Sequence, residues 1–157
     1  GWGMPDLSAI FGRQQPLMVD QTIVFKASGE MHTWNLVLND PGEDLRVTLV
    51  WTDAPGATVG PALVNDLDLE VVAGGTTYLG NVFQGGLSTS GGFADETNNV
   101  ESVFLPFGGY EQVQVRVTAW NISGDGVPGN ADPTDQDFAL VVTSRSGLMY
   151  FFPLMGR

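Results

Sequence analysis

Apolar and polar side chains alternate through residues 111–120, and this alternation limits the fold more than any other feature of the sequence. Val113, Val115 and Val117 fall on one side of an extended chain, whereas Gln114 and Arg116 fall on the other. A helix would scatter these valines around its axis, because its period is 3.6 residues rather than two. A strand with one apolar and one polar face is typical of an antiparallel sheet that buries one of its sides.

Similar short segments recur along the chain, and glycine and proline separate them. The 157 residues include 21 glycines and 9 prolines, and this punctuation is typical of an all-β protein. The pattern predicts an all-β fold, an antiparallel sandwich or barrel of about eight to nine strands. We expect these strands at 22–28, 31–38, 45–51, 67–72, 76–79, 101–105, 111–120, 137–144 and 148–154.

The beginning of the chain has a different character. Asp6 can cap a short helix over residues 7–11, and a glycine follows where helices often end. Pro16 then prevents the helix from continuing. We therefore expect a short N-terminal helical remnant within residues 1–15 and the β-sandwich over residues 16–157. The opening glycine, tryptophan and glycine are typical of the cut end of a longer chain.

The charge of the chain favours a cation as its partner. Eighteen acidic residues outweigh six basic ones, giving a net charge of −12, and the chain has no cysteine. Like charges repel nucleic acid and anionic membranes, and no apolar run is long enough for a membrane helix, so we expect neither partner. Sixty-nine positions between Arg46 and Arg116 contain no basic residue but eight carboxylates. A bound divalent metal is the simplest source of neutralising charge for that stretch.

The run Asn65-Asp66-Leu67-Asp68-Leu69-Glu70 is the most informative part of this acidic stretch. The two-residue period places Asp66, Asp68 and Glu70 on one side of a strand, about 6.5–7 Å apart. The run Asn98-Asn99-Val100-Glu101 offers further oxygen ligands at the start of another strand, and calcium binds six to eight oxygens. These residues fit a calcium site. They equally fit a simpler role, in which Asn65 and Asp66 cap a turn and the other carboxylates face solvent.

A second group of oxygen-bearing side chains lies in the long loop 121–136 and just after it. The group does not have the spacing of an EF-hand, so we favour a solvated, turn-rich loop over a metal site. The loops 53–65 and 84–99 are also long, and loops of this length are usually functional or held by a ligand. The second group comprises Asp125, Asn130, Asp132, Asp135 and Asp137.

Enzymatic activity finds little support in the residues. The one histidine, His32, falls in an expected strand, and no serine has the flanking glycines of a nucleophile elbow. Glycoside hydrolysis by a carboxylate pair stays open, but nothing singles out the pair.

Three tryptophans lie in or at the end of expected strands: Trp34, Trp51 and Trp120. At such positions a place in the core or at an interface is favoured. The alternative is an exposed platform in a carbohydrate- or surface-binding module.

Several ordered motifs resemble the C-terminal β-sandwich of secreted subtilisin-like serine proteases, most of all the oxidation-resistant alkaline protease type. The likeness also includes the start of the chain, which resembles the segment that opens the final helix of the subtilase catalytic domain. The motifs, in order, are Gly1-Trp2-Gly3-Met4-Pro5-Asp6-Leu7, Leu45-Arg46-Val47-Thr48-Leu49-Val50-Trp51-Thr52-Asp53-Ala54-Pro55, Leu63-Val64-Asn65-Asp66-Leu67-Asp68-Leu69, Tyr78-Leu79-Gly80-Asn81, Asn98-Asn99-Val100-Glu101-Ser102-Val103-Phe104, Val115-Arg116-Val117-Thr118-Ala119-Trp120-Asn121 and Phe138-Ala139-Leu140-Val141-Val142.

The resemblance implies a jelly-roll-like antiparallel β-sandwich that serves as a non-catalytic accessory domain in a secreted, extracellular bacterial protein. Residues 1–15 would be the tail end of the catalytic domain, and residues 16–157 would pack on that protease domain and stabilise it. The subtilase triad motifs are absent from this sequence, so any serine endopeptidase activity would belong to the parent protein. The family commonly carries calcium in this domain, and the implied metal ligands here are Asp66, Asp68, Asn98, Asn99 and Glu101, together with Asp53.

Overall fold

The computed structural model describes residues 16–106 and 108–150, and they form eleven strands. The predicted helix within residues 1–15 and the last part of the strand predicted at 148–154 lie outside the described residues. The strands are β1 (Leu17–Phe25), β2 (Met31–Leu38), β3 (Leu45–Val50), β4 (Asp66–Ala73), β5 (Thr76–Leu79), β6 (Phe83–Gln84), β7 (Leu87–Ser88), β8 (Val100–Leu105), β9 (Gln112–Asn121), β10 (Gln136–Thr143) and β11 (Leu148–Tyr150).

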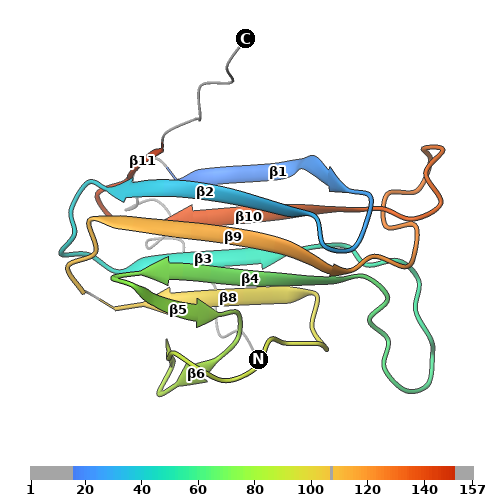
Figure 1. Ribbon diagram of the computed structural model, residues 1–157, viewed down its shortest axis with the longest axis horizontal. Helices are drawn as coiled ribbons and strands as arrows, with labels where there is room; N and C mark the ends of the chain where they lie inside the picture. Colours follow the sequence, from blue (N-terminus) through green and yellow to red (C-terminus); the bar gives the residue numbers. More distant parts are fainter. Residues whose placement is uncertain (1–15, 107, 151–157) are drawn as a thin grey trace, which may run out of the picture.

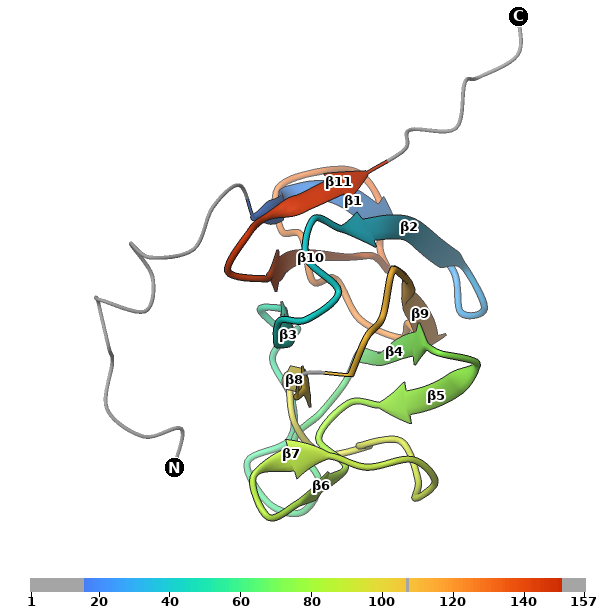
Figure 2. The same cartoon turned by 90° about the vertical axis from the view of Figure 1, so that its left-hand side faces the viewer.

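Two antiparallel sheets face each other and confirm the predicted β-sandwich (Figures 1 and 2). One sheet has the strand order β1-β10-β3-β8, and the other has the order β11-β2-β9-β4-β5. The pairs β1 with β10, β2 with β9, β3 with β8 and β4 with β5 are nested within one another along the sequence. Such nesting describes one long antiparallel hairpin that is rolled up across two sheets, which is the jelly-roll arrangement.

The core lies between the two sheets and is built by the alternation seen in the sequence. Val113, Val115 and Val117 are buried, as are Leu67, Leu69 and Val71 on the neighbouring strand β4. The largest side chains of the core are Trp51, Phe25 and Phe138, and the last two stack with ring centroids 5.3 Å apart. Each such side chain contributes roughly 1.5–3 kcal/mol by leaving water. Burial between the sheets therefore fixes which face of each strand points inward.

The structure differs from the prediction at the first strand and at one hairpin. Strand β1 begins at Leu17 rather than at residue 22, because Leu17 and Val19 also face the core. The alternation breaks at Gln21, which has a φ of 51° and lies in an irregularity of the β1–β10 pairing. The β6–β7 hairpin was not predicted, since its two-residue strands are too short to show a period.

The long loops gather at one end of the sandwich, the right-hand end in Figure 1. Residues 51–65 and 122–135 meet there, beside the starts of β4 and β8. The acidic motifs at residues 66–70 and 98–101 are thereby brought to the same end of the molecule. The described part of the chain contains no helix with the length and apolar character that a membrane crossing requires.

Candidate functional site

Glu101 is a carboxylate that points into the sandwich from β8. Its side chain lies on the inward face of the strand, opposite Leu49, and the residue is 1% exposed. Its Oε2 atom accepts a hydrogen bond of 2.7 Å from the backbone N–H of Leu69. Strand β5 pairs with β4 only over Glu70–Ala73, so the Leu69 N–H lies just beyond the end of that ladder. Glu101 thus satisfies a backbone donor that no neighbouring strand reaches.

The second oxygen of Glu101 has no such compensation. The Oε1 atom is buried and has no hydrogen-bond partner. Burial, together with the nearby charges of Asp68, Asp95 and Asp66, raises the pKa of Glu101 to about 8, although the Leu69 N–H opposes the shift. A buried carboxylate with an unpaired oxygen is costly to hold in its charged form.

Gly80 leaves the space that Glu101 occupies. A Cβ atom at position 80 would lie 2.1 Å from Oε2 of Glu101 and 2.7 Å from its Cδ atom. The Gly80 N–H also donates to the carbonyl of Leu69, at 2.9 Å. The glycine is therefore required by the close approach of the backbone to the carboxylate.

Asp66 is the second buried carboxylate of this region. It is the first residue of β4 and is 8% exposed, and its Oδ1 atom has no hydrogen-bond partner. Burial raises its pKa to about 6, with further contributions from Asp68, Glu96 and Asp95. The pKa of Asp68 is raised as well, by burial and then by Glu96 and Glu70. These mutual effects place the carboxylates around a common corner of the molecule.

We call the group Asp66, Asp68, Asp95, Glu96 and Glu101 the acidic corner. Within the part of the chain that the structure describes, no ion pair includes a member of the group. The neighbouring Glu70 does have a cationic partner, the guanidinium of Arg116. No three histidine or carboxylate side chains among the described residues form an assembled metal-binding group. The acidic corner is thus a concentration of negative charge rather than a complete set of metal ligands.

The other predicted ligands lie at the margins of the acidic corner. Asn98 is exposed, and its amide donates to Asp95 at 2.7 Å. The amide of Asn99 donates to the carbonyl of Trp51 at 2.8 Å, and Asp53 accepts hydrogen bonds from two backbone N–H groups at residues 64 and 65. The structure therefore brings Asp66, Asp68 and Glu101 together and gives Asn98, Asn99 and Asp53 other hydrogen-bond partners.

The sequence reasoning missed Asp95 and its partner Asn81. The amide of Asn81 donates to Asp95 at 2.6 Å and to the carbonyl of Val100 at 2.8 Å. Burial alone would raise the pKa of Asp95, but hydrogen bonds from Asn81, Thr97 and Asn98 together lower it to about 2. The spacing of Asp95 and Thr97 is a turn signal visible in the sequence. The contact with Asn81 depends on the path of the chain after β5 and leaves no such signal.

Asn65 acts as a structural link between loops rather than as a turn cap alone. Its amide nitrogen donates to the side chain of Gln136 at 2.9 Å and to the carbonyls of Gly124 and Asp135. Its amide oxygen accepts from the N–H groups of Ser123 and Gly124. The capping role considered for this residue is thus filled by contacts to a distant loop, whereas Oδ1 of Asp66 caps nothing.

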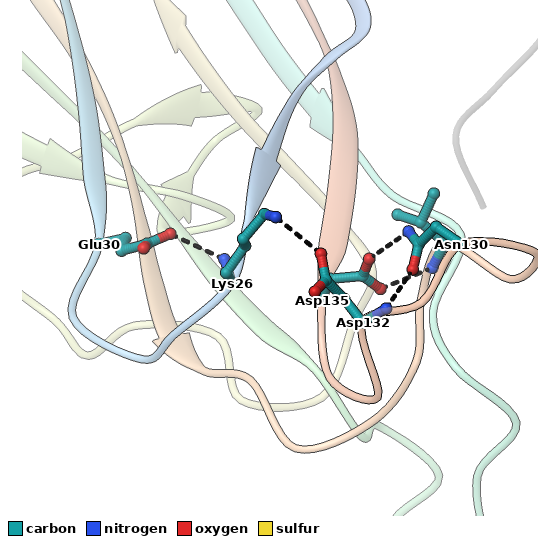
Figure 3. A network of polar contacts seen from close by, with 6 residues as sticks. Lys26, Glu30, Asn130, Asp132 and Asp135 are labelled. Atoms are coloured by element: carbon teal, nitrogen blue, oxygen red, sulfur yellow. Dashed lines mark hydrogen bonds and ion pairs between the residues drawn. The ribbon is translucent and has the colours of Figure 1, made fainter.

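The second oxygen-rich group is held by its own hydrogen bonds (Figure 3). Asp135 is buried and accepts from the Asn130 amide at 2.6 Å and from the Val127 N–H at 3.1 Å. Asp132 forms an ion pair of 2.7 Å with Lys26. Hydrogen bonds within the loop agree with its predicted turn-rich character, but its predicted solvation is wrong for Asp135 and Asp137, which are buried.

The aromatic residues divide between core and surface. Trp51 is buried and donates through Nε1 to the carbonyl of Asn65 at 3.0 Å, and Trp34 packs against Phe138 at the edge of the core. Trp120 is 64% exposed, so the core position is wrong for this residue, and the interface position stays a prediction. Trp120 follows the regular alternation of β9, which places it on the same outward side as Gln114.

His32 lies on β2 beside two aromatic rings. Its ring lies 5.5 Å from the ring of Phe25 and 6.2 Å from that of Trp34, measured between centroids. This environment agrees with the preferred interpretation of His32 as a side chain on the face of a strand.

A scan against protein-family models and a search of curated proteins found no match to this chain.

Proposed function

We propose that this chain is a non-catalytic β-sandwich domain that calcium stabilises at the acidic corner. The observation that carries the proposal is the pair of buried, unpartnered oxygens, Oδ1 of Asp66 and Oε1 of Glu101. Buried charges in proteins are normally paired or coordinate a metal. Two such oxygens among five carboxylates fit a cation better than they fit any other ligand.

Calcium is the cation that suits these groups. It prefers oxygen ligands, accepts six to eight of them and tolerates irregular geometry, so carboxylates, backbone carbonyls and water can share the coordination. Asp66, Asp68 and Glu101 would supply the negative charge together with Asp95. Asn98, Asn99 and Asp53 would support them from the margins. A bound ion would supply the positive charge that keeps the buried carboxylates ionised at neutral pH.

The resemblance to subtilase C-terminal domains extends the proposal to a biological setting. The domain would serve as the accessory domain of a secreted bacterial serine endopeptidase of the subtilisin family, packing on its N-terminal protease domain. Calcium would then stabilise the parent enzyme outside the cell, and this chain would cleave nothing by itself. Cleavage of casein by the purified chain would contradict the non-catalytic part of the proposal.

A calcium titration in a calorimeter tests the metal part. We expect the wild-type chain to bind calcium and Glu101→Gln to bind it much more weakly, because the variant loses the most deeply buried charge of the acidic corner. Glu111→Gln is the matched control: it makes the same chemical change at an exposed position outside the acidic corner. Equal binding by all three proteins would remove Glu101 from the site, and no binding by the wild type would refute the proposal.

The alternative function, carbohydrate binding, rests on Trp120 alone. Its exposed ring could stack on a sugar, but Trp34 and Trp51 belong to the core and cannot extend the platform. Sugar-dependent changes in tryptophan fluorescence that Trp120→Ala abolishes would favour this alternative.

A further inference from the structure

A groove lies on the outer surface of the β11-β2-β9-β4-β5 sheet, at the end of β4 that is far from the acidic corner. Its volume is about 300 Å³, at the lower end of the range for pockets that hold small molecules. Strand β9 forms the floor, and β2 and β4 form the sides, because β9 lies between them (Figure 1). We call it the amide groove, and its lining includes Asn35, Val37, Val72, Gly74, Gln112 and Gln114.

Amide side chains supply the polar part of the lining. Asn35 lies directly opposite Gln114 in the β2–β9 pair, and Nε2 of Gln114 donates to Oδ1 of Asn35 at 2.9 Å. Oε1 of Gln114 accepts from the guanidinium of Arg116 at 2.7 Å, so Gln114 is held from both sides. Gln112 is the next outward residue of β9 and is exposed. Each amide can donate two hydrogen bonds and accept others, so these contacts leave donors for a ligand.

The amide groove is neutral, although the chain carries a net charge of −12. None of the described residues that line it is charged. Arg116 and Glu70 are the next outward residues along β9 and β4, and they form an ion pair with each other. An anionic ligand would be repelled by the charge of the chain, and a cationic ligand would find no carboxylate in the lining. The groove therefore suits an uncharged ligand.

The backbone and the apolar lining narrow the choice further. Strand β9 pairs with β2 on one side and with β4 on the other, so an extended peptide cannot add itself to the sheet in the groove. Val37 and Val72 are half-buried and give the two sides apolar surface. A wholly apolar ligand would take the amides away from water without replacing their hydrogen bonds. A sugar satisfies both parts of the lining, because its hydroxyls bond to amides while its C–H groups contact apolar side chains.

We propose that the amide groove binds a neutral saccharide. This site goes beyond the proposed function and does not depend on calcium, because Asp66 begins β4 and lies six residues, about 20 Å, from Val72. It is also separate from Trp120, which lies on the same side of β9 but six residues from Gln114. The remainder of this outer surface is mixed, since Met31 and Met149 are exposed on it as well. The amides and their neutral surroundings, rather than exposure alone, thus distinguish the groove.

Calorimetric titration of the full chain with neutral hexasaccharides tests the inference. The probes are cellohexaose, xylohexaose, mannohexaose and maltohexaose, each at millimolar concentration in a chelating buffer, so that calcium takes no part. Wild type is compared with Gln112→Ala and Asn35→Ala, which each remove one amide from the groove. Gln84→Ala is the matched control, because it removes the same group as Gln112→Ala at an exposed position on β6. Urea unfolding of each variant checks that it folds.

We expect at least one hexasaccharide to bind wild type, and each groove variant to weaken that binding by roughly three- to tenfold, the value of one hydrogen bond. Gln84→Ala should bind as wild type does. No binding of any of the four probes would overturn the inference, as would equal binding by wild type and the groove variants. Binding that Trp120→Ala abolishes and Gln112→Ala leaves unchanged would also overturn it, since the sugar would then lie on the exposed ring. Calcium titration of Gln112→Ala should match wild type, which keeps the two proposals separable.

Discussion

Replacing Glu101 by glutamine should make the calcium-free protein more stable at alkaline pH. The variant keeps the shape of the side chain, and its amide oxygen can still accept the hydrogen bond from the Leu69 N–H. It removes the charge that burial and the neighbouring carboxylates oppose. In a chelating buffer no metal offsets that charge, so the neutral side chain suits the acidic corner better.

The magnitude follows from the pKa of Glu101, which rises from 4.5 to about 8 on folding. Below pH 4.5 Glu101 is protonated in both the folded and the unfolded chain, so it does not lower the free energy of unfolding. Between these two values the unfolded chain releases the proton more readily, so the free energy of unfolding falls as the pH rises. At 1.36 kcal/mol per pKa unit the loss above pH 8 is at most roughly 5 kcal/mol. Glutamine carries no charge and avoids this loss. After relaxation of the site we expect the variant's free energy of unfolding above pH 8 to exceed that of wild type by roughly 2 to 5 kcal/mol.

Urea unfolding in chelator at pH 5 and pH 8.5 measures this difference. At pH 5 Glu101→Gln and wild type should agree within about 1 kcal/mol, and at pH 8.5 the variant should be the more stable. Glu111→Gln, with the same chemical change at an exposed position, should follow wild type at both values. A variant that is less stable than wild type at pH 8.5 would refute the reasoning, because it would show that ionised Glu101 stabilises the calcium-free fold.

Three further substitutions test the packing around the site, each measured by urea unfolding. Gly80→Ala should lower the free energy of unfolding by roughly 1–3 kcal/mol and weaken calcium binding, because the added Cβ would lie 2.1 Å from Oε2 of Glu101. An unchanged free energy of unfolding would show that the carboxylate moves freely. Asn65→Ala should lower the free energy of unfolding by roughly 2–4 kcal/mol, because it loses buried hydrogen bonds. Asn121→Ala, at an exposed position, should lower it by less than about 1 kcal/mol. Equal losses in the two variants would contradict the linking role of Asn65. Trp120→Ala should change stability by less than about 0.5 kcal/mol, and a larger loss would show that its ring packs on the fold.

Much of the fold could be predicted because burial between two sheets imposes a strict period. The valines at 113, 115 and 117 and the run from residue 67 to residue 71 alternate as a half-buried strand must, and the structure buries the expected sides. The start of β1 could not be placed, because the irregularity at Gln21 interrupts the period. The β6–β7 hairpin also escaped prediction, since two residues cannot establish an alternation.

The candidate site was only partly predictable for a related reason. The half-buried position of Asp68 follows from the period of β4, whereas the burial of Asp66 at the start of that strand does not. The start of β8 lies at the same end of the sandwich. Glu101 shares the inward side of β8 with Val103 and Leu105. Its hydrogen bond from the Leu69 N–H depends on where β5 stops, which the sequence does not display. Asp95 reaches the acidic corner through a contact with Asn81, fourteen positions away in the sequence. Such contacts between loops have no period that a sequence could display.

Thermal unfolding of the wild-type chain with calcium and with chelator, at pH 7.5, tests the central claim most directly. Calcium at a hundredfold excess over its Kd should stabilise the folded state by about 2.7 kcal/mol. For a chain of this length that free energy raises Tm by roughly 5–11 °C. The same Tm in calcium and in chelator would contradict the account, because the buried carboxylates of Asp66 and Glu101 would then have gained nothing from the ion.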